Sequence, residues 1–525
     1  MNSFKLFFVI ILNFAVVYIA QEFKEADVVM LTGSVDAQYD SDIHTATDLE
    51  GNVYITGKFK NDAAVTSKHQ NAEGDSLFIT SVDIASNGDF DIFLAKYDID
   101  GILLWAISFG GEGADIGKAV ACNSTGDVIV TGTFQGTVNF DGILLTSTTS
   151  SNLFIASFNS EGKIKWATRG GGVTKLQVVE YGSGLAIDQF DNVYVSGAFF
   201  GSTEPPDYSI PGVGTIGDYE IKGAVQAYNS FVAKLTKNGK VEWVSCFGHY
   251  GLGAANAICT DIAGNAYITG VCSATFIVNG EVKKSNGLVD IYVAKFNTDG
   301  SFGWFKQLGS GESFNAADAM SYTDPFETGT GICSDALGNI YVTGQFADEC
   351  KFGEFELESE GFSDIFIVKI NGEGNVIWAS STGANYGDLA TAIAFDGKGY
   401  IYITGINSDY GGLDIESTAT FSSPGWKTVT ERGIGFVERY NISDGKMDWG
   451  AGAGSWGSSL AANSKNEMHL VGTFANQVKF DDNTKLDIKK IIDSEYESGG
   501  LFSRGKKIET YIAGSAIYMV KIVDE

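Results

Sequence analysis

Residues 260–270, TDIAGNAYITG, decide the fold, because variants of this stretch recur seven times along the chain. Each copy consists of a short apolar strand, a turn that begins with Asp or Asn, and a second strand that ends at Gly. The Asp or Asn side chain can accept a hydrogen bond from the backbone two residues further on, and the Gly or Asn that follows tolerates the left-handed turn conformation. Every copy therefore predicts a hairpin of fixed length. The turns begin at Asp48, Asn123, Asp188, Asp261, Asp335, Asp396 and Asn463, each at the same spacing before Gly57, Gly132, Gly197, Gly270, Gly344, Gly405 and Gly472.

A second hairpin follows in each copy, as in DIYVAKF at residues 290–296 and FGWFKQLG at residues 302–309. Its strands carry apolar side chains on both faces, so each sheet must be covered on both sides. Two hairpins per copy make a four-stranded sheet, and sheets stacked face to face around an axis satisfy this requirement. In six copies the start of the hairpin and a later Trp are separated by one constant spacing. The pairs are Asp91 and Trp105, Asn152 and Trp166, Asn229 and Trp243, Asp290 and Trp304, Asp364 and Trp378, and Gly435 and Trp449.

The pattern predicts an all-β fold: a single seven-bladed β-propeller of four-stranded antiparallel blades over residues 21–525. The chain ends after the third strand of the last copy, so the missing fourth strand should come from the N-terminus. The spacing from Trp243 to Gly270 recurs in two other copies. The residue at the same spacing before Gly57 is Met30, which lies in an apolar run. We therefore expect residues 26–34 to close the last blade. The repeats are approximately residues 35–108, 109–170, 171–248, 249–309, 310–383, 384–453 and 454–525.

The repeat resembles the SBBP-type bacterial β-propeller repeat. The resemblance is clearest in copy four, quoted above, and in copy five, with SDALGNIYVTG at residues 334–344 and VIWASSTG at residues 376–383. It covers about the whole chain after Ala20. Membership implies a propeller fold and a secreted or surface location. It implies no particular activity.

Residues 1–20 are typical of an export signal, with Lys5 before an apolar run over residues 6–20 that is short for a membrane span. We expect cleavage after Ala20, a secreted or cell-surface protein and no stable membrane insertion after cleavage; an uncleaved anchor is the alternative. The formal net charge of −30 repels phosphate backbones, which argues against nucleic acid as a partner.

Loop length points to one face of the disc as the binding face. The turns with the fixed spacings share one face, whereas insertions fall in the second turn and in the links between blades. Because binding residues concentrate on loops held by a rigid scaffold, we expect the face with the insertions to bind a glycan or a protein. The aromatic candidates for ligand contacts are Tyr208, Tyr219, Tyr228, Phe314, Tyr322, Phe326, Trp426 and Trp456. The alternative is that these insertions are surface decoration.

Cofactors are not required by any motif in the sequence. Carboxylates in the links between blades are weak candidates for Ca²⁺, but their spacing never reaches a full D-x-D-x-D-G loop. The candidates are Asp115, Asp318, Asp324 and Asp388. The six cysteines show no C-x-x-C spacing, and Cys259 and Cys333 stand where other copies have Ala, so we expect them to be small buried residues.

Three functions are compatible with the sequence. The first is a secreted or cell-surface binding module without chemistry, and the second is a structural component of an envelope or extracellular matrix. The third is a carbohydrate-active hydrolase or lyase with paired carboxylates in the central funnel. The chain has four His and lacks H-E-x-x-H, G-x-S-x-G and a Gly-rich phosphate loop. We therefore name no catalytic residue and prefer the binding module.

Overall fold

A computed structural model gives the architecture of the chain. It describes residues 29–32, 43–70, 77–172, 181–201, 212–223, 227–249, 253–310, 327–383, 387–407, 419–420, 430–431, 434–452, 456–474, 477–479, 485–487 and 516–522. The predicted signal at residues 1–20 lies outside these ranges. The described residues include no helix long and apolar enough to traverse a bilayer.

The described residues form six four-stranded antiparallel blades and a three-stranded terminal sheet. Blade 1 has β2 (His44–Thr47), β3 (Val53–Gln70), β4 (Leu77–Tyr97) and β5 (Leu103–Phe109). Blade 2 has β6 (Ile116–Cys122), β7 (Val128–Phe134), β10 (Asn152–Phe158) and β11 (Ile164–Gly172). Blade 3 has β12 (Tyr181–Ile187), β13 (Val193–Gly201), β16 (Ala227–Leu235) and β17 (Val241–His249).

The second half of the molecule repeats this plan. Blade 4 has β18 (Gly253–Thr260), β19 (Ala266–Val278), β20 (Glu281–Phe296) and β21 (Phe302–Ser310). Blade 5 has β22 (Thr328–Ser334), β23 (Ile340–Phe346), β26 (Asp364–Ile370) and β27 (Val376–Thr382). Blade 6 has β28 (Leu389–Phe395), β29 (Tyr400–Asn407), β32 (Ile434–Asn441) and β33 (Met447–Gly452), and the terminal sheet has β34 (Trp456–Ala462), β35 (Met468–Phe474) and β38 (Ala516–Ile522). Every blade therefore pairs its strands in chain order.

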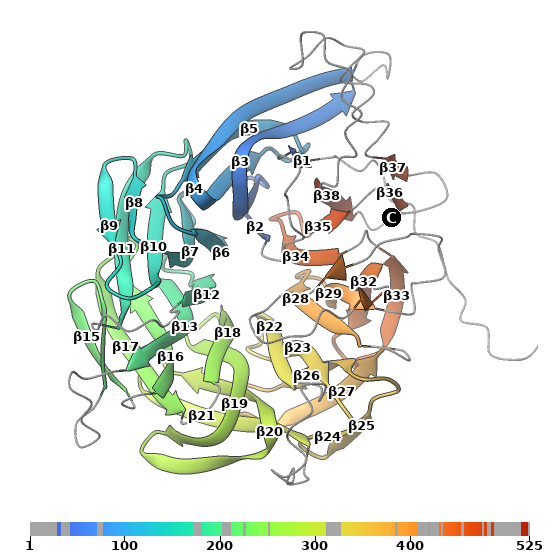
Figure 1. Cartoon of the computed structure of the whole chain (residues 1–525). Helices are drawn as coiled ribbons and strands as arrows, with labels where there is room; N and C mark the ends of the chain where they lie inside the picture. Colours follow the sequence, from blue (N-terminus) through green and yellow to red (C-terminus); the bar gives the residue numbers. More distant parts are fainter. Residues whose placement is uncertain are drawn as a thin grey trace, which may run out of the picture.

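The blades are arranged around a central axis, with the first strand of each blade nearest that axis (Figure 1). Neighbouring first strands contact one another, and β34 of the terminal sheet contacts β2 of blade 1. Two hydrogen bonds join these ends of the chain: Thr45 N donates to Ser459 Oγ at 3.2 Å, and Thr47 Oγ1 donates to the Ala462 carbonyl at 2.7 Å. The all-β propeller arrangement expected from the repeat is confirmed.

The hydrophobic cores lie between neighbouring blades, because the middle strands are buried on both faces. All seven residues of β7 and all seven of β10 are buried. Five of the six repeated Trp side chains bind the next blade, as their predicted packing role requires, whereas Trp449 Nε1 is buried without a hydrogen-bond partner among the described residues. The Nε1 atoms of the five donate to carbonyls there: Trp105 to Ser160 at 3.0 Å, and Trp166 to Lys237, Trp243 to Thr298, Trp304 to Gly372 and Trp378 to Ile442 at 3.1 Å each.

The second turns of the blades differ from the expected loops, both in copy three with its insertion and in copies without one, because those quoted below fold as β-structure against the preceding blade. Hairpin β14 (Gly212–Ile216) and β15 (Tyr219–Gly223), which belongs to copy three, pairs with β11 of blade 2. Hairpin β24 (Glu349–Phe352) and β25 (Phe355–Glu358) pairs with β21 of blade 4, and the far end of β19 pairs with β17. Hairpin β8 (Thr137–Phe140) and β9 (Ile143–Thr146) contacts β5. An outer strand offers unpaired backbone groups, which explains why an adjacent hairpin pairs with it.

The N-terminal strand also differs from the prediction. Strand β1 (Val29–Thr32) pairs with the far end of β3, with Val29 opposite Ser67 and Thr32 opposite Ala64. It lies beside β38, but in the described residues its backbone pairs with blade 1. The long β3–β4 hairpin presents an edge at this point, which the repeat pattern did not reveal. Short pairs β30 (Ala419–Thr420) with β31 (Thr430–Glu431) and β36 (Gln477–Lys479) with β37 (Lys485–Asp487) complete the described strands.

Candidate functional site

The predicted aromatic residues do not form one cluster in the described part of the chain. Tyr219 is 38% exposed on β15. Tyr228 is half-buried on β16 and packs edge-on against Phe200, with ring centroids 5.3 Å apart. Trp456 is half-buried on β34, next to the axis. The remaining candidates, Tyr208, Phe314, Tyr322, Phe326 and Trp426, lie outside the described residues.

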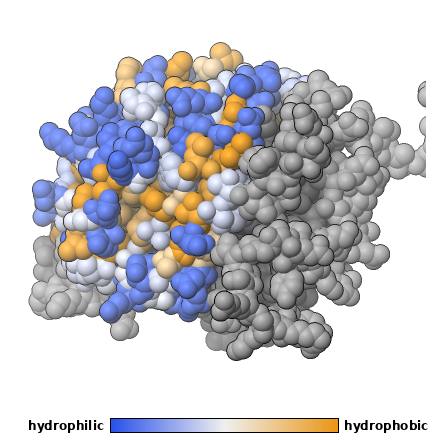
Figure 2. Space-filling view, turned by 90° about the horizontal axis from the view of Figure 1, so that it is seen from above, coloured by the Kyte–Doolittle hydropathy of each residue, from blue (hydrophilic) through white to orange (hydrophobic). Residues whose placement is uncertain are grey.

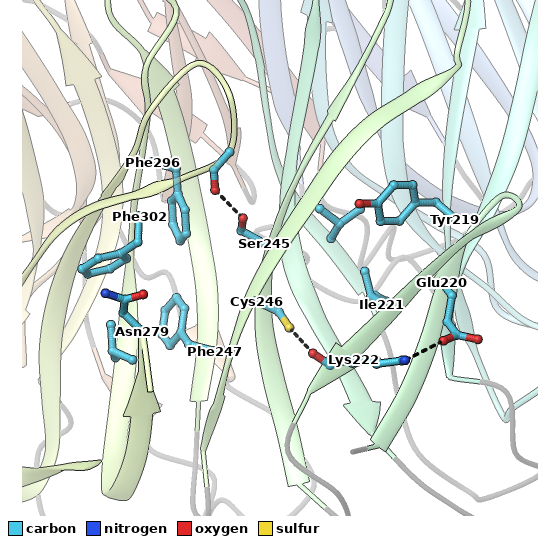
Figure 3. Close-up of a pocket in the computed structure, with 13 residues that line it drawn as sticks. Tyr219, Glu220, Ile221, Lys222, Ser245, Cys246, Phe247, Asn279, Phe296 and Phe302 are labelled. Carbon is cyan, nitrogen blue, oxygen red and sulfur yellow. Dashed lines mark hydrogen bonds and ion pairs between the residues drawn. The ribbon is translucent and has the colours of Figure 1, made fainter. Parts of the chain in front are cut away.

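Tyr219 lines a pocket of about 590 Å³ on the outer rim, between blades 3 and 4. One wall is the β14–β15 hairpin, with Tyr219 and Ile221, and the opposite wall carries Phe296 and Phe302 of blade 4 (Figure 3). Ser245 and Cys246 of β17 lie between these walls, and Phe247 of the same strand lies on the side of Phe296 (Figure 3). The lining therefore combines aromatic side chains with polar groups, and the polar groups make up the larger part of its exposed surface.

Polar groups of the pocket are already engaged with the protein. Cys246 Sγ donates to the Lys222 carbonyl at 2.9 Å, and Ser245 Oγ donates to the Gly300 carbonyl at 2.6 Å (Figure 3). Burial raises the pKa of the Cys246 thiol to about 11, so it is protonated at neutral pH and a poor nucleophile. Glu220 and Lys222 form an ion pair of 3.5 Å at the exposed edge. The pocket can hold an apolar group, but its described residues contain no base next to a nucleophile.

The turns between the first and second strands of the blades form a second candidate surface, which is exposed rather than concave. Each turn is closed by its buried Asp or Asn: Asp335 accepts hydrogen bonds from Leu337 N, Asn339 N, Asn339 Nδ2 and Tyr341 OH, at 2.8 to 2.9 Å. The two residues after this Asp therefore point into solvent. Turn residues of this kind are usually polar.

In four blades, however, one of these exposed positions carries a large apolar side chain: Leu49 of blade 1 is 67% exposed, and blades 3, 4 and 5 carry one each in succession. Phe190 of blade 3 is 66% exposed, Ile262 of blade 4 is 61% exposed and Leu337 of blade 5 is 88% exposed. We call these three side chains the apolar arc. Single exposed apolar residues are common on proteins, but three on the same turn of adjacent blades make a patch.

Hydrogen bonds hold the three turns of the arc side by side. Gln189 Nε2 donates to the Ile262 carbonyl at 2.6 Å, which joins the turns of blades 3 and 4. Ser334 Oγ donates to the Thr260 carbonyl at 2.8 Å, which joins the strands that enter the turns of blades 4 and 5. The arc therefore lies on a rigid support.

The three turns of the arc expose no charge of their own in a strongly acidic chain. Residues 188–192, 261–265 and 335–339 contain four carboxylates, and all four are buried: Asp188, Asp191, Asp261 and Asp335. In contrast, the equivalent turns of blade 6 and of the terminal sheet expose Lys398 and Lys465. An uncharged apolar surface in a chain of net charge −30 suits a partner that presents apolar side chains. The repeat pattern does not predict this surface, because turns of fixed length indicate a structural role only.

Two of the calcium candidates are described, and both are buried. Asp115 and Asp388 each have no exposed surface. Among the described residues, no group of three or more His, Cys, Asp or Glu side chains is arranged to hold a metal ion. Asp318 and Asp324 lie outside the described residues. All six cysteines are free thiols, and Cys259 is buried as expected, whereas Cys333 is half-buried.

Strand order and geometry define the chain as a β-propeller, and comparisons with known proteins add one relative. No protein-family model matches the chain. The uncharacterized WD repeat-containing protein L264 of Acanthamoeba polyphaga mimivirus is 23% identical over 535 residues, which cover 86% of this chain and 36% of that protein. The chain thus spans about a third of the relative's length.

Two solved structures show similarity to the chain at low scores. A chain of the Mitotic Checkpoint Complex is 8% identical, with a TM-score of 0.40 over 90% of this chain and 96% of that chain. Quinohemoprotein alcohol dehydrogenase from Comamonas testosteroni is 10% identical, with a TM-score of 0.39 over 93% and 75% of the two chains. Similarity at this level supports no inference about function.

Proposed function

We propose that the chain is a non-catalytic binding module that holds a protein partner on the apolar arc. The observation that carries this proposal is the exposure of Phe190, Ile262 and Leu337 on three adjacent turns whose own residues expose no charge. Exposed apolar patches on rigid scaffolds are typical of protein interfaces, where a few large side chains supply most of the binding energy. The description of the viral relative as a WD repeat-containing protein agrees with an interaction role.

Three finer features belong to the same proposal. The terminal sheet is the seventh blade, and β1 (Val29–Thr32) connects it to blade 1 rather than completing it as a fourth strand. Residues 1–20 direct the chain out of the cell, so that it acts as a secreted or surface protein of the SBBP type. Ca²⁺ is not needed for partner binding. These features rest on the repeat pattern and the composition of the N-terminus.

Site-specific photo-crosslinking tests the partner surface. A photo-reactive phenylalanine analogue replaces Leu337 in the full chain, which is then irradiated in its native setting. The control carries the analogue at Leu144, which is 65% exposed on the β8–β9 hairpin of another blade. We expect a discrete protein adduct from position 337 that position 144 does not give. Equal adducts from both positions, or none from position 337, would contradict the proposal.

A glycan is the second candidate ligand, and the rim pocket is the feature that favours it. Tyr219 is exposed beside Glu220 and Lys222, so an aromatic ring and charged hydrogen-bonding groups stand together. A glycan array with the purified chain, with and without Ca²⁺, tests this candidate. Saturable binding that Tyr219→Ala abolishes would place a glycan in the pocket, and binding that persists in this variant would reject that placement.

A further inference from the structure

Three junctions between blades contain pairs of buried carboxylates. In each pair, one residue lies on the third strand of a blade and the other lies at the entry to the next blade. None of the six side chains is more than 5% exposed. The pairs are Asp91 with Asp115, Asp290 with Glu327, and Asp364 with Asp388. A buried carboxylate without a compensating charge is costly, so each pair requires an explanation.

The pair between blades 1 and 2 is the clearest. Both oxygens of Asp115 accept backbone N–H groups, from Gly111 at 2.7 Å and from Gln135 at 2.9 Å. Asp91 Oδ2 accepts the N–H of Asn87 at 2.9 Å. Asp91 Oδ1 is buried and has no hydrogen-bond partner among the described residues. This oxygen is therefore the place where a compensating group is expected.

Backbone contacts hold the two carboxylates at one junction, and the backbone around them is closely packed. Asp115 N donates to the carbonyl of Phe90, the neighbour of Asp91, at 2.7 Å. A Cβ on Gly110 would lie only 2.3 Å from Asp91 Cγ, so the glycine backbone packs directly against this carboxylate. The junction between blades 5 and 6 repeats this packing, because a Cβ on Gly383 would lie within 2.8 Å of both Asp364 and Asp388. Such close packing favours a proton over a hydrated or multiply coordinated cation.

We propose that Asp91 and Asp115 hold one proton between them, and that this protonated pair fastens blade 1 to blade 2 in acidic solution and loosens as the proton is lost. Two carboxylates that share one buried site cannot both ionise cheaply, because each charge disfavours the other. With the proton in place, only one negative charge remains at the junction.

The electrostatic surroundings agree with this assignment. Burial raises the pKa of Asp115 to about 7, against the two backbone hydrogen bonds, and the nearby Asp91 charge raises it further. Burial also raises the pKa of Asp91. A carboxyl with a raised folded-state pKa stabilises the fold below the unfolded pKa of about 3.9, and this stabilisation is lost as the pH rises to about 7.

Other charged groups on the surrounding elements point elsewhere. Glu112 lies on the link that carries Asp115, and Asp89 is exposed on β4, where it pairs with Lys60 at 2.6 Å. Lys58 and Lys60 of β3 lie over the ring of Phe90, at 4.9 and 5.3 Å from its centre. Lys118 of β6 lies 6.0 Å from the ring of Tyr181.

Blade 2 supplies a natural comparison, because the residue equivalent to Asp91 is Asn152. This side chain has no exposed surface. Its Oδ1 accepts the N–H of Thr148 at 2.6 Å, and its Nδ2 donates to Thr149 Oγ1 at 2.9 Å. The fold thus accepts an uncharged amide at this position, so Asp91→Asn is a conservative test that removes one carboxylate of the pair.

The experiment compares urea unfolding of the full chain, Asp91→Asn and the control Asp100→Asn from about pH 4.5 to about 8. Asp100 is exposed in the turn of the same blade. We expect the unfolding constant of the wild type to increase by at least about tenfold relative to Asp91→Asn between about pH 5 and 7.5, and then to level off. Asp100→Asn should follow the wild type. Parallel curves for the wild type and Asp91→Asn would overturn the proposal.

A second measurement does not depend on how the variant folds. Infrared difference spectra of the wild type between pH 6 and 8 should show the loss of a buried protonated carboxyl band near neutral pH. The absence of this band in the wild type would overturn the proposal. Stabilisation of the wild type by millimolar Ca²⁺ that Asp91→Asn lacks would also overturn it, because a cation would then compensate the pair.

Discussion

At the residue scale, one hydrogen-bonded group recurs in the blades and links a turn to a neighbouring blade. In blade 5, Asp335 binds its own turn and the hydroxyl of Tyr341, and Lys369 Nζ lies 5.4 Å from the centre of the Tyr341 ring. The Tyr341 ring packs against Trp378, whose Nε1 donates to the carbonyl of Ile442 in blade 6. A single repeated motif therefore fixes both the turn and the contact between blades.

Replacing the turn aspartate should be costly. Asp335→Ala removes four hydrogen bonds and leaves buried donors without an acceptor, so we expect it to lower the free energy of unfolding by about 3 kcal/mol. Urea unfolding at pH 7 measures this loss. Asp299→Ala, at an exposed turn, is the control and should have a much smaller effect. Equal losses in the two variants would contradict the assigned role.

The same residue gives the protein sensitivity to acid. Burial acts to raise the pKa of Asp335, but hydrogen bonds from Asn339, Tyr341 and Leu337 outweigh it and hold the pKa below its ordinary value. Its stabilising contribution is therefore present at neutral pH and is lost as the pH falls below about 4. The stability difference between the wild type and Asp335→Ala should narrow below this pH, and a constant difference would contradict this account.

At the element scale, hairpins of the second turns pair their backbone with the sheet of the preceding blade. The β24–β25 hairpin of blade 5 extends the sheet of blade 4, and its Phe352 packs against Phe346 and Phe366, with ring centroids 5.9 and 4.9 Å apart. Apolar side chains also reach the surface between polar ones on the edge seen in Figure 2. Phe352, in contrast to these exposed side chains, is fully buried between its hairpin and the blade.

Truncating this aromatic anchor should weaken two blades together. Phe352 has no exposed surface, so we expect Phe352→Ala to lower the free energy of unfolding by about 3 to 5 kcal/mol. The matched control is Phe362→Ala, since Phe362 is 65% exposed in the same blade. Chemical denaturation of both variants tests the difference. A loss below about 1 kcal/mol for Phe352→Ala would show that the hairpin is dispensable.

The repeated elements were predictable from sequence, whereas the partners of the insertions were not. Fixed spacings to Gly270 and Trp304 predicted the hairpins and the packing of the Trp, because these residues act within the repeat. The pairing of β14 with β11 depends on an unpaired edge of the preceding blade, which no local pattern encodes. Asp91 and Asp115 belong to different copies of the repeat, and only the fold brings them to one junction.

At the scale of the whole molecule, the first and last parts of the chain meet. Thr45 and Thr47 of β2 bind Ser459 and Ala462 of the terminal sheet, at the other end of the sequence. Contacts between residues so far apart in the sequence carry a loop-closure entropy cost, and several interactions together must offset it. Strand β1 lies at the same junction, beside β38 and paired with β3.

Removal of the N-terminal strand tests its role at this junction. We expect deletion of residues 21–34 to lower the melting temperature by several degrees, because the β1–β3 pairing and the contact with β38 are lost. Deletion of residues 21–25 alone is the control and should leave the melting temperature unchanged. Identical melting curves for the two deletions would reject a closing role for the strand.

The most direct test of the proposed function is the dissociation constant of the cross-linked partner for Leu337→Asp. Isothermal titration with purified components compares this variant with the wild type and with Leu144→Asp. A charge in the middle of an apolar interface should weaken binding at least about tenfold, equivalent to about 1.4 kcal/mol, while Leu144→Asp binds like the wild type. Unchanged affinity of a folded Leu337→Asp variant would contradict the assignment of the apolar arc as the binding surface.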